Sequence, residues 1–306
     1  MGKDILKRFL SYVEITTKLA SVMPALLGLF YAYYRYGRLD WPNTVLFLFS
    51  MLCFDMATTA LNNYMDTRNH GVPLQFPLLT ARVILFTLLI LATGSGIILA
   101  LRSGPVVLAC GVLCFLIGIF YTAGPAPIAY MPLGEAFSGL FMGFFIPLLA
   151  MLVNAPAGQP LIALGLEGWT LQLSLDLAAL LRLGILCLPP VCGIANIMLA
   201  NNICDVPKDT AKRRYTLPYH IGIQPALRLF AGLYGLAFLA VIAVAVAGIL
   251  PVYVLGVLIA ILPVWKNVAR FREKQDKRET FPLSVQNFML IMAPLALLAL
   301  AAALFG

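Results

Sequence analysis

Long apolar stretches separated by short polar segments recur along the whole chain. A helix that crosses a ~30 Å hydrocarbon layer needs about 20 residues, and apolar runs near that length occur nine times. They cover residues 15–36, 44–64, 80–101, 105–122, 134–153, 177–200, 224–250, 251–265 and 285–305. The pattern predicts an all-α integral membrane protein with nine transmembrane helices.

The composition agrees with this pattern. Of the 306 residues, 61% are hydrophobic and 11% are charged, and the mean hydropathy is +0.93, far from the balance of a soluble domain. The first apolar stretch is long, contains Lys18 and lacks a small-residue cleavage site after it, so we expect a retained span and not a cleaved signal peptide. We expect one transmembrane domain over 1–306, in two halves of about 1–155 and 156–306, located in the cell membrane.

The net charge of +8 lies mainly in loops that flank the apolar stretches. Cytoplasmic loops collect Lys and Arg, and a cytoplasmic N-terminus places most of the 21 basic residues on that side. Four would face outward: Arg35, Arg38, Arg102 and Arg182. Nine spans then leave the C-terminus outside. Because the charge is spread over membrane-flanking loops, nucleic acid is excluded as a partner.

A polar sequence frame interrupts the second apolar stretch. It reads NNYMDTRNH over residues 62–70. Asn62 and Asp66 stand four apart and share one helix face, and Asp55 and Thr59 extend that stripe inward. Ionisable side chains are costly in lipid, so we expect the stripe to line a central cavity and not to face the bilayer. For Asp55 alone, an ion pair with a neighbouring helix is an equal alternative.

The same frame recurs at the end of the sixth stretch as NNICDVPKD, residues 201–209. Asn201 or Asn202, Asp205 and Asp209 repeat the layout, and Pro207 is expected to bend or stop the helix. Carboxylates at two helix ends suit Mg²⁺, which takes one or two carboxylates and fills its other positions with water and phosphate. With both copies on the cytoplasmic side, the pattern predicts a diphosphate site.

Basic residues follow the second copy in the segment KRRYTLP, where Lys212, Arg213 and Arg214 are placed to bind phosphate oxygens. A single N-x-x-x-D in a membrane helix more often makes a polar contact between helices, and basic loops usually record topology. Two matched copies favour the metal site over these alternatives.

With these motifs in order, the chain resembles the UbiA superfamily of intramembrane prenyltransferases, which carry two Asp-rich motifs after the second and sixth of nine helices. Within it, the chain looks most like the 1,4-dihydroxy-2-naphthoate polyprenyltransferases of menaquinone synthesis. Three stretches carry the resemblance: TKLASVMPALLG (17–28), YTAGPAPIAYMPLGE (121–135) and NNICDVPKDTAKRRYTLPYHIG (201–222).

The resemblance implies a role for each matching residue. Asn62, Asp66, Asn202, Asp205 and Asp209 would bind Mg²⁺; Arg68, Lys212, Arg214 and Thr216 would bind the diphosphate; Asp66, Asp205, Asp209 and Arg214 would carry catalysis. The first motif departs from the family, since Asn63 stands where Asp is usual and its last acidic position is His70 or missing. Imidazole is a poor ligand for Mg²⁺, so a structural or phosphate-contacting role for His70 is favoured.

In the family's reaction, a polyprenyl diphosphate loses its diphosphate and the prenyl group is transferred to the ring of 1,4-dihydroxy-2-naphthoate, with loss of CO₂, to give demethylmenaquinone. Aromatic faces attract a cation-like prenyl end. The substrate cavity is expected to contain Asp55, Thr59, Tyr64, Tyr121, Glu135 and Tyr215, with Phe120 and Phe141 as further aromatic candidates.

Two alternatives stay open. A related enzyme could prenylate another acceptor, such as a phenol, a haem precursor or a glycerol phosphate. In a different class, an ion-coupled transporter with internal repeats also carries similar polar segments in two helices. The polar frames lie at the ends of the stretches beside basic loops, whereas transporter sites lie near mid-span, and this favours the enzyme.

Overall fold

The computed structural model describes residues 2–305; the side chains of Lys3, His70 and Leu166 lie outside that description. In the first half, an amphipathic helix precedes the spans, and the sixth and seventh helices continue one another through a π-helical turn. The elements are α1 (Gly2–Tyr12), the 3-10 turn η1 (Ile15–Lys18), α2 (Leu19–Tyr36), α3 (Trp41–His70), α4 (Leu78–Ser103), α5 (Pro105–Thr122), η2 (Ile128–Tyr130), α6 (Gly134–Leu140), η3 (Phe141–Phe145) and α7 (Ile146–Asn154).

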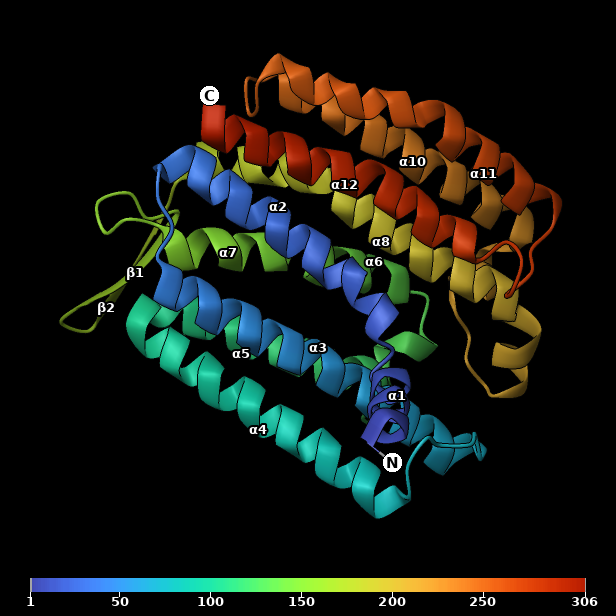
Figure 1. Cartoon of the computed structure of the whole chain (residues 1–306). Coiled ribbons are helices and arrows are strands. Elements are labelled where there is room, and N and C mark those ends of the chain that lie inside the picture. The colour runs from blue at the N-terminus through green and yellow to red at the C-terminus, as the bar shows by residue number, and fades with distance from the viewer. Residues whose placement is uncertain (1, 306) are drawn as a thin grey trace.

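The second half begins with a β-hairpin and contains the longest helix. Its elements are β1 (Ile162–Glu167), β2 (Thr170–Leu175), α8 (Leu177–Ala211), α9 (Leu217–Ile221), α10 (Ile223–Val246), η4 (Val252–Ala260), α11 (Ile261–Glu273) and α12 (Pro282–Phe305). The hairpin and the C-terminus lie at one end of the helix bundle, and α1 lies at the other (Figure 1). The C-terminal ends of α3 and α8, which carry the polar frames, lie at the same end as α1.

Nine helical segments of the described residues are long and apolar enough to cross a membrane, in the predicted order. This confirms the expected multi-pass, all-α fold. Three helices continue well past their predicted ends: α3 to His70, α8 to Ala211 and α11 to Glu273. Helix α8 therefore does not stop at Pro207. A proline removes only one backbone hydrogen bond, and the helical turns on both sides of it stay intact. Both polar frames are helical and not in loops.

The β-hairpin was not predicted. Its strands pair in antiparallel register, with Glu167 opposite Thr170 across a turn in which Gly168 has φ +60°. The segment LIALGLEGWTLQLSL alternates leucine with other residues, a period of two that is typical of strands. The segment is too short to form a membrane span, so the pattern of apolar stretches does not reveal it.

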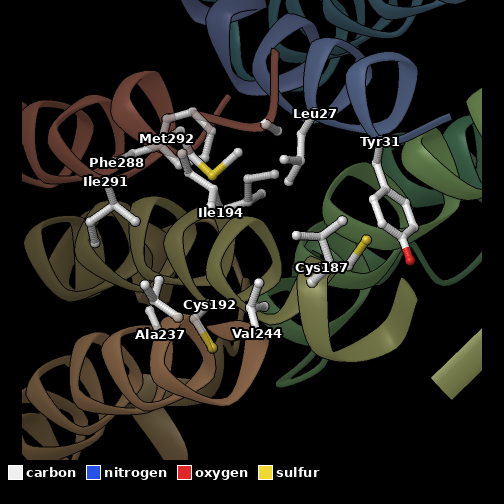
Figure 2. Close-up of a cluster of buried hydrophobic side chains, with 14 of the residues drawn as sticks. Leu27, Tyr31, Cys187, Cys192, Ile194, Ala237, Val244, Phe288, Ile291 and Met292 are labelled. Atoms are coloured by element: carbon white, nitrogen blue, oxygen red, sulfur yellow. The ribbon is translucent and has the colours of Figure 1, made fainter. Parts of the chain in front are cut away.

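The largest core surrounds α8. Figure 2 shows side chains from α2 (Leu27, Tyr31), α8 (Cys187, Cys192, Ile194), α10 (Ala237, Val244) and α12 (Phe288, Ile291, Met292) meeting there. A second, smaller core joins Tyr12 and Val13 to α3, α4 and the loop between them. The N-terminal segment is thereby fixed against the end of the bundle that carries the first polar frame.

Glycines let α6 and η3 approach α8 closely. A Cβ added to Gly143 would lie 2.5 Å from the backbone nitrogen of Val191, and one on Gly139 would lie 2.7 Å from the Val191 carbonyl oxygen. Small residues at helix interfaces allow this kind of backbone contact in membranes. The contact fixes α6, which carries Glu135, relative to the second polar frame.

We expect Gly143→Ala to lower the free energy of unfolding by about 1–3 kcal/mol, the usual range for overpacking, because the backbone of Val191 cannot move aside as a side chain can. Thermal unfolding in detergent measures the change. Gly184→Ala is the matched control on α8, since a Cβ there meets nothing within 4 Å. An equal unfolding temperature for the two variants would contradict the close contact.

Candidate functional site

The first polar frame ends at an ion pair between distant parts of the chain. Arg214, after α8, donates to the Asp66 carboxylate on α3 and, over 3.2 Å, to the hydroxyl of Tyr130. Its guanidinium lies 4.5 Å from the centre of the Tyr130 ring. Burial lowers the pKa of Arg214, but the adjacent Asp66 and Tyr130 raise it, and the net direction is upward. Arg214 therefore stays charged.

The turn after α8 brings Arg214 to this position. Arg213 has φ +57°, a left-handed conformation that reverses the chain. The backbone N–H of Arg214 then donates to the carbonyl of Asp209 (2.8 Å), and that of Tyr215 donates to the carbonyl of Tyr130 (3.0 Å). Backbone bonds on both sides thus determine where the guanidinium lies.

The second polar frame forms an ion pair with a lysine from another loop. Lys277, between α11 and α12, contacts the Asp205 carboxylate at 2.5 Å and donates to the side-chain oxygen of Asn201. Lys208 lies 3.7 Å from the other Asp205 oxygen, with its side chain 74% exposed. Lys277 was not among the predicted site residues, because a basic loop residue also serves as a topology signal and nothing in its local sequence points to Asp205.

Side-chain bonds within the loop hold Lys277 in place. The Asp276 carboxylate accepts hydrogen bonds from the backbone N–H groups of Arg278 (2.8 Å) and Glu279 (2.9 Å). These bonds lower the pKa of Asp276. Lys274 and Glu279 form an ion pair at 2.6 Å. The loop is thus braced on both sides of Lys277, which it directs towards α8.

Asp209 lies deeper than Asp205. It is 9% exposed and within electrostatic reach of one carboxylate and three cations: Asp205, Arg214, Lys277 and Lys212. Thr216 is 2% exposed, and its hydroxyl has no hydrogen-bond partner among the described residues. A buried hydroxyl of this kind is available to a ligand oxygen.

Glu135 joins α6 to the second frame. Its Oε1 accepts a hydrogen bond from the Asn202 amide at 2.8 Å, whereas its buried Oε2 has no partner among the described residues. The Tyr121 hydroxyl lies 3.1 Å from the Ser138 hydroxyl and donates to the Gly134 carbonyl at 3.4 Å. Glu135 thus contacts the α8 frame directly, and the Tyr121 hydroxyl lies against the same short helix, α6.

Asp55 and Thr59 contact the first span. Lys18 is 4% exposed and donates to the Asp55 carboxylate at 2.7 Å and to the Thr59 hydroxyl at 2.6 Å. Ser21 donates to the second Asp55 oxygen at 2.5 Å. The pairing of Asp55 with a neighbouring helix is thus observed, and its place in the substrate cavity stays a prediction.

The side chains of Tyr64 and Arg68 lie on a different face of α3 from Asp66. Each is two residues from Asp66, about 200° around a helix. The Tyr64 hydroxyl accepts from Arg82 on α4 at 2.9 Å, and both Tyr64 and Arg68 line a pocket with Arg82. The structure therefore places Arg68 beside Arg82 of α4, and its assignment to the diphosphate stays a prediction.

Two other predicted positions, Tyr215 and Asn63, make contacts elsewhere. Tyr215 is 41% exposed and packs 4.9 Å from the Tyr219 ring, measured between centroids. The Asn63 amide donates to the Tyr12 carbonyl at 2.9 Å, so it faces the N-terminal segment and not Asp66. The prediction for His70 concerns a side chain outside the described residues.

The predicted metal ligands all supply oxygen atoms, the donors that Mg²⁺ prefers; they are Asn62, Asp66, Asn202, Asp205 and Asp209. Among the described residues, no group of three or more His, Cys, Asp or Glu side chains is arranged to hold a metal ion. Mg²⁺ does not require one when phosphate completes its coordination. The Lys277 ammonium already binds one carboxylate and one amide oxygen of the second frame. The donor set therefore fits Mg²⁺ bound together with a diphosphate.

Comparison with known proteins identifies the family. A model of the UbiA prenyltransferase family matches residues 21–293, well over half of the chain. The chain belongs to the UbiA prenyltransferase family. It is a multi-pass membrane prenyltransferase, which confirms the resemblance seen in its motifs.

Among UbiA relatives, the 1,4-dihydroxy-2-naphthoate octaprenyltransferase of Bacillus subtilis (strain 168) is 28% identical over 244 residues, covering 76% of this chain and 71% of that protein. The enzyme of the same name from Mycobacterium tuberculosis is 29% identical over 154 residues, covering 49% and 44%. Both relatives are 1,4-dihydroxy-2-naphthoate octaprenyltransferases.

Solved structures share the fold. A UbiA homolog from Archaeoglobus fulgidus bound to DMAPP and Mg²⁺ superposes with a TM-score of 0.64 at 13% identity, covering 98% of this chain and 100% of that one. A digeranylgeranylglyceryl phosphate synthase gives the same TM-score at 18% identity, with 99% of each chain covered. The UbiA fold thus extends over nearly the whole chain.

Proposed function

We propose that this UbiA-family enzyme transfers a polyprenyl group from polyprenyl diphosphate to 1,4-dihydroxy-2-naphthoate, releasing diphosphate and CO₂ and forming demethylmenaquinol, the reduced form of demethylmenaquinone. The observation that carries the proposal is the Arg214 bridge, which ties Asp66 on α3 to the segment that follows Asp205 and Asp209 on α8. The similarity to two 1,4-dihydroxy-2-naphthoate octaprenyltransferases supports the acceptor.

The diphosphate binds between the two frames, next to Arg214, Lys212 and Lys277. Asp66, Asp205 and Asp209, with the amide oxygens of Asn62 and Asn202, would hold Mg²⁺; the A. fulgidus UbiA homolog was solved with both DMAPP and Mg²⁺ bound. Bound Mg²⁺ would neutralise charge on the diphosphate oxygens. Arg214 stabilises the negative charge that develops on the leaving diphosphate as the allylic C–O bond breaks.

In this proposal, Lys277 and Arg214 leave their carboxylate partners when the substrate binds, and they contact oxygens of the diphosphate instead. Both side chains are less than two-fifths exposed, and their charge is neutralised by carboxylates until an anion enters. Arg214 keeps a planar fork for phosphate, and the buried Thr216 hydroxyl offers a further donor. The Arg214 segment also shields the prenyl cation from water, which would otherwise hydrolyse it.

The acceptor ring attacks the prenyl carbon from the side of Glu135 and Tyr121. We assign the unpartnered Oε2 of Glu135 to accept an acceptor hydroxyl hydrogen, because it is a buried carboxylate oxygen with no hydrogen-bond partner among the described residues. The prenyl chain extends along the aromatic series Phe137, Phe141 and Phe145, whose rings stack with centroids 5.9 and 4.7 Å apart. The uneven distribution of Lys and Arg supports an orientation in the cell membrane with the motifs cytoplasmic and the C-terminus outside.

The proposal is tested by incubating the purified enzyme with Mg²⁺, prenyl diphosphates of several lengths and a panel of acceptors that includes a phenol and a glycerol phosphate. We expect diphosphate release and a decarboxylated prenyl naphthoquinol by mass analysis, both abolished by EDTA and restored by Mg²⁺. Product with another acceptor only would reject the naphthoate assignment. Absence of diphosphate release with every acceptor would reject prenyl transfer and favour the transporter alternative.

A further inference from the structure

A basic pocket lies between α3 and α4, outside the cluster around Arg214. It has a volume of about 530 Å³ and is lined by Tyr64, Thr67, Arg68, Leu78 and Arg82. None of the residues assigned to metal binding lines it. The pocket contains two guanidinium groups and no carboxylate among its lining residues, so its charge is not neutralised locally.

The guanidinium of Arg82 is oriented by a neighbour. It donates to the Tyr64 hydroxyl at 2.9 Å and lies 5.7 Å from the centre of the Tyr64 ring. Arg82 is on the second turn of α4, whose first turn includes Leu78. The N-terminal N–H groups of this 26-residue helix add positive potential beside the two guanidinium groups. The pocket therefore fits an anion with phosphate-like charge.

Below the pocket, α4 presents a continuous apolar stripe. Leu79, Val83, Phe86 and Ile90 are 72%, 58%, 55% and 70% exposed, and their spacing puts them on one face of the helix together with Arg82. From Arg82 to Ile90 the stripe rises about 12 Å along the bilayer normal of an untilted helix. A charged pocket at the helix end thus continues into a surface suited to an acyl chain.

We propose that this groove is a binding site for an anionic phospholipid, whose headgroup phosphate contacts Arg68 and Arg82 and whose acyl chain lies along α4. Basic pockets between transmembrane helices at a membrane surface bind anionic headgroups in this way. The proposal gives Arg68 a lipid phosphate as partner in place of the substrate diphosphate. The site also explains why two arginines lie beside a face that is otherwise apolar.

Native mass spectrometry of the full chain in detergent tests the site, with dioleoyl phosphatidylglycerol as probe and dioleoyl phosphatidylcholine as the neutral comparison. We expect preferential binding of phosphatidylglycerol. Each basic group near an anionic headgroup contributes about fivefold, so Arg68→Gln/Arg82→Gln should weaken phosphatidylglycerol binding about 25-fold and leave phosphatidylcholine binding unchanged.

Arg270→Gln/Arg272→Gln is the matched control. Both arginines are exposed in the last turns of α11 at the same end of the bundle, and their loss removes the same charge, so phosphatidylglycerol binding should stay within about twofold. An equal loss in both double variants would reduce the effect to general charge and overturn the site.

Two further arms identify the ligand on the unaltered protein. A photoreactive phosphatidylglycerol should crosslink within residues 64–90, and excess inorganic phosphate should not displace it. Displacement by inorganic phosphate would make the pocket a free-anion site. Displacement by farnesyl diphosphate at lower concentration than by phosphatidylglycerol would make it a substrate site, and either result overturns the lipid proposal.

Discussion

Replacing Asp205 by Asn should lower kcat for prenyl transfer by about a hundredfold or more, the range seen when one group that stabilises developing charge is removed. The substitution keeps size and hydrogen-bonding oxygen but removes the charge that would hold Mg²⁺. Asp205 is also the carboxylate that Lys277 contacts at 2.5 Å. Steady-state assays with a prenyl diphosphate and 1,4-dihydroxy-2-naphthoate measure the loss.

Asp176→Asn is the control on the same helix. Asp176 caps the N-terminus of α8 at the opposite end, where its carboxylate accepts from the Ala179 N–H at 2.9 Å. Asn caps helices about as well as Asp, so the control should fold normally and retain activity within about twofold. Wild-type turnover in Asp205→Asn, with Mg²⁺ still required, would reject the role given to the second frame.

Arg214→Gln should lower kcat/KM by about a hundredfold or more, because it removes the positive charge that contacts the diphosphate and leaves the half-buried Asp66 carboxylate without its partner. Arg214→Lys should recover only part of the loss, since a lysine lacks the planar fork of arginine. The two variants separate charge from geometry. Initial rates over a range of prenyl diphosphate concentrations measure both.

Arg213→Gln provides the comparison for Arg214. Arg213 is the adjacent residue, carries the same charge and is exposed, so its replacement should change kcat/KM by less than about threefold, as for most surface positions. If both variants lose the same activity, the effect comes from the net charge of the loop and not from contact between Arg214 and the diphosphate.

The helix pattern of this protein was readable from its sequence because the bilayer forces each span to be long and apolar. Helix ends were less readable. The polar residues of the frames interrupt the apolar run, so α3 and α8 were predicted to end early, although their backbone hydrogen bonding continues to His70 and Ala211. Hydropathy marks where lipid ends, and it does not mark where a helix ends.

The candidate site was readable where it depends on spacing within one helix. Asp205 and Asp209 are four residues apart on α8, and the structure keeps them close. Lys277 was not found, because its contact with Asp205 joins residues 72 apart in the chain and depends on how α11 and α12 pack. Arg68 was grouped with the diphosphate by family resemblance; the structure places it at the pocket that it lines with Arg82 of α4, and its role with the diphosphate stays a prediction.

The central claim is that the frames on α3 and α8 bind one diphosphate between them. An experimental structure with Mg²⁺ and a non-hydrolysable prenyl thiodiphosphate tests it most directly. We expect the diphosphate between Asp66 and the Asp205–Asp209 pair, with Arg214 on its oxygens and Lys277 moved away from Asp205. A diphosphate bound elsewhere, with the Asp66–Arg214 and Asp205–Lys277 pairs intact, would contradict the account.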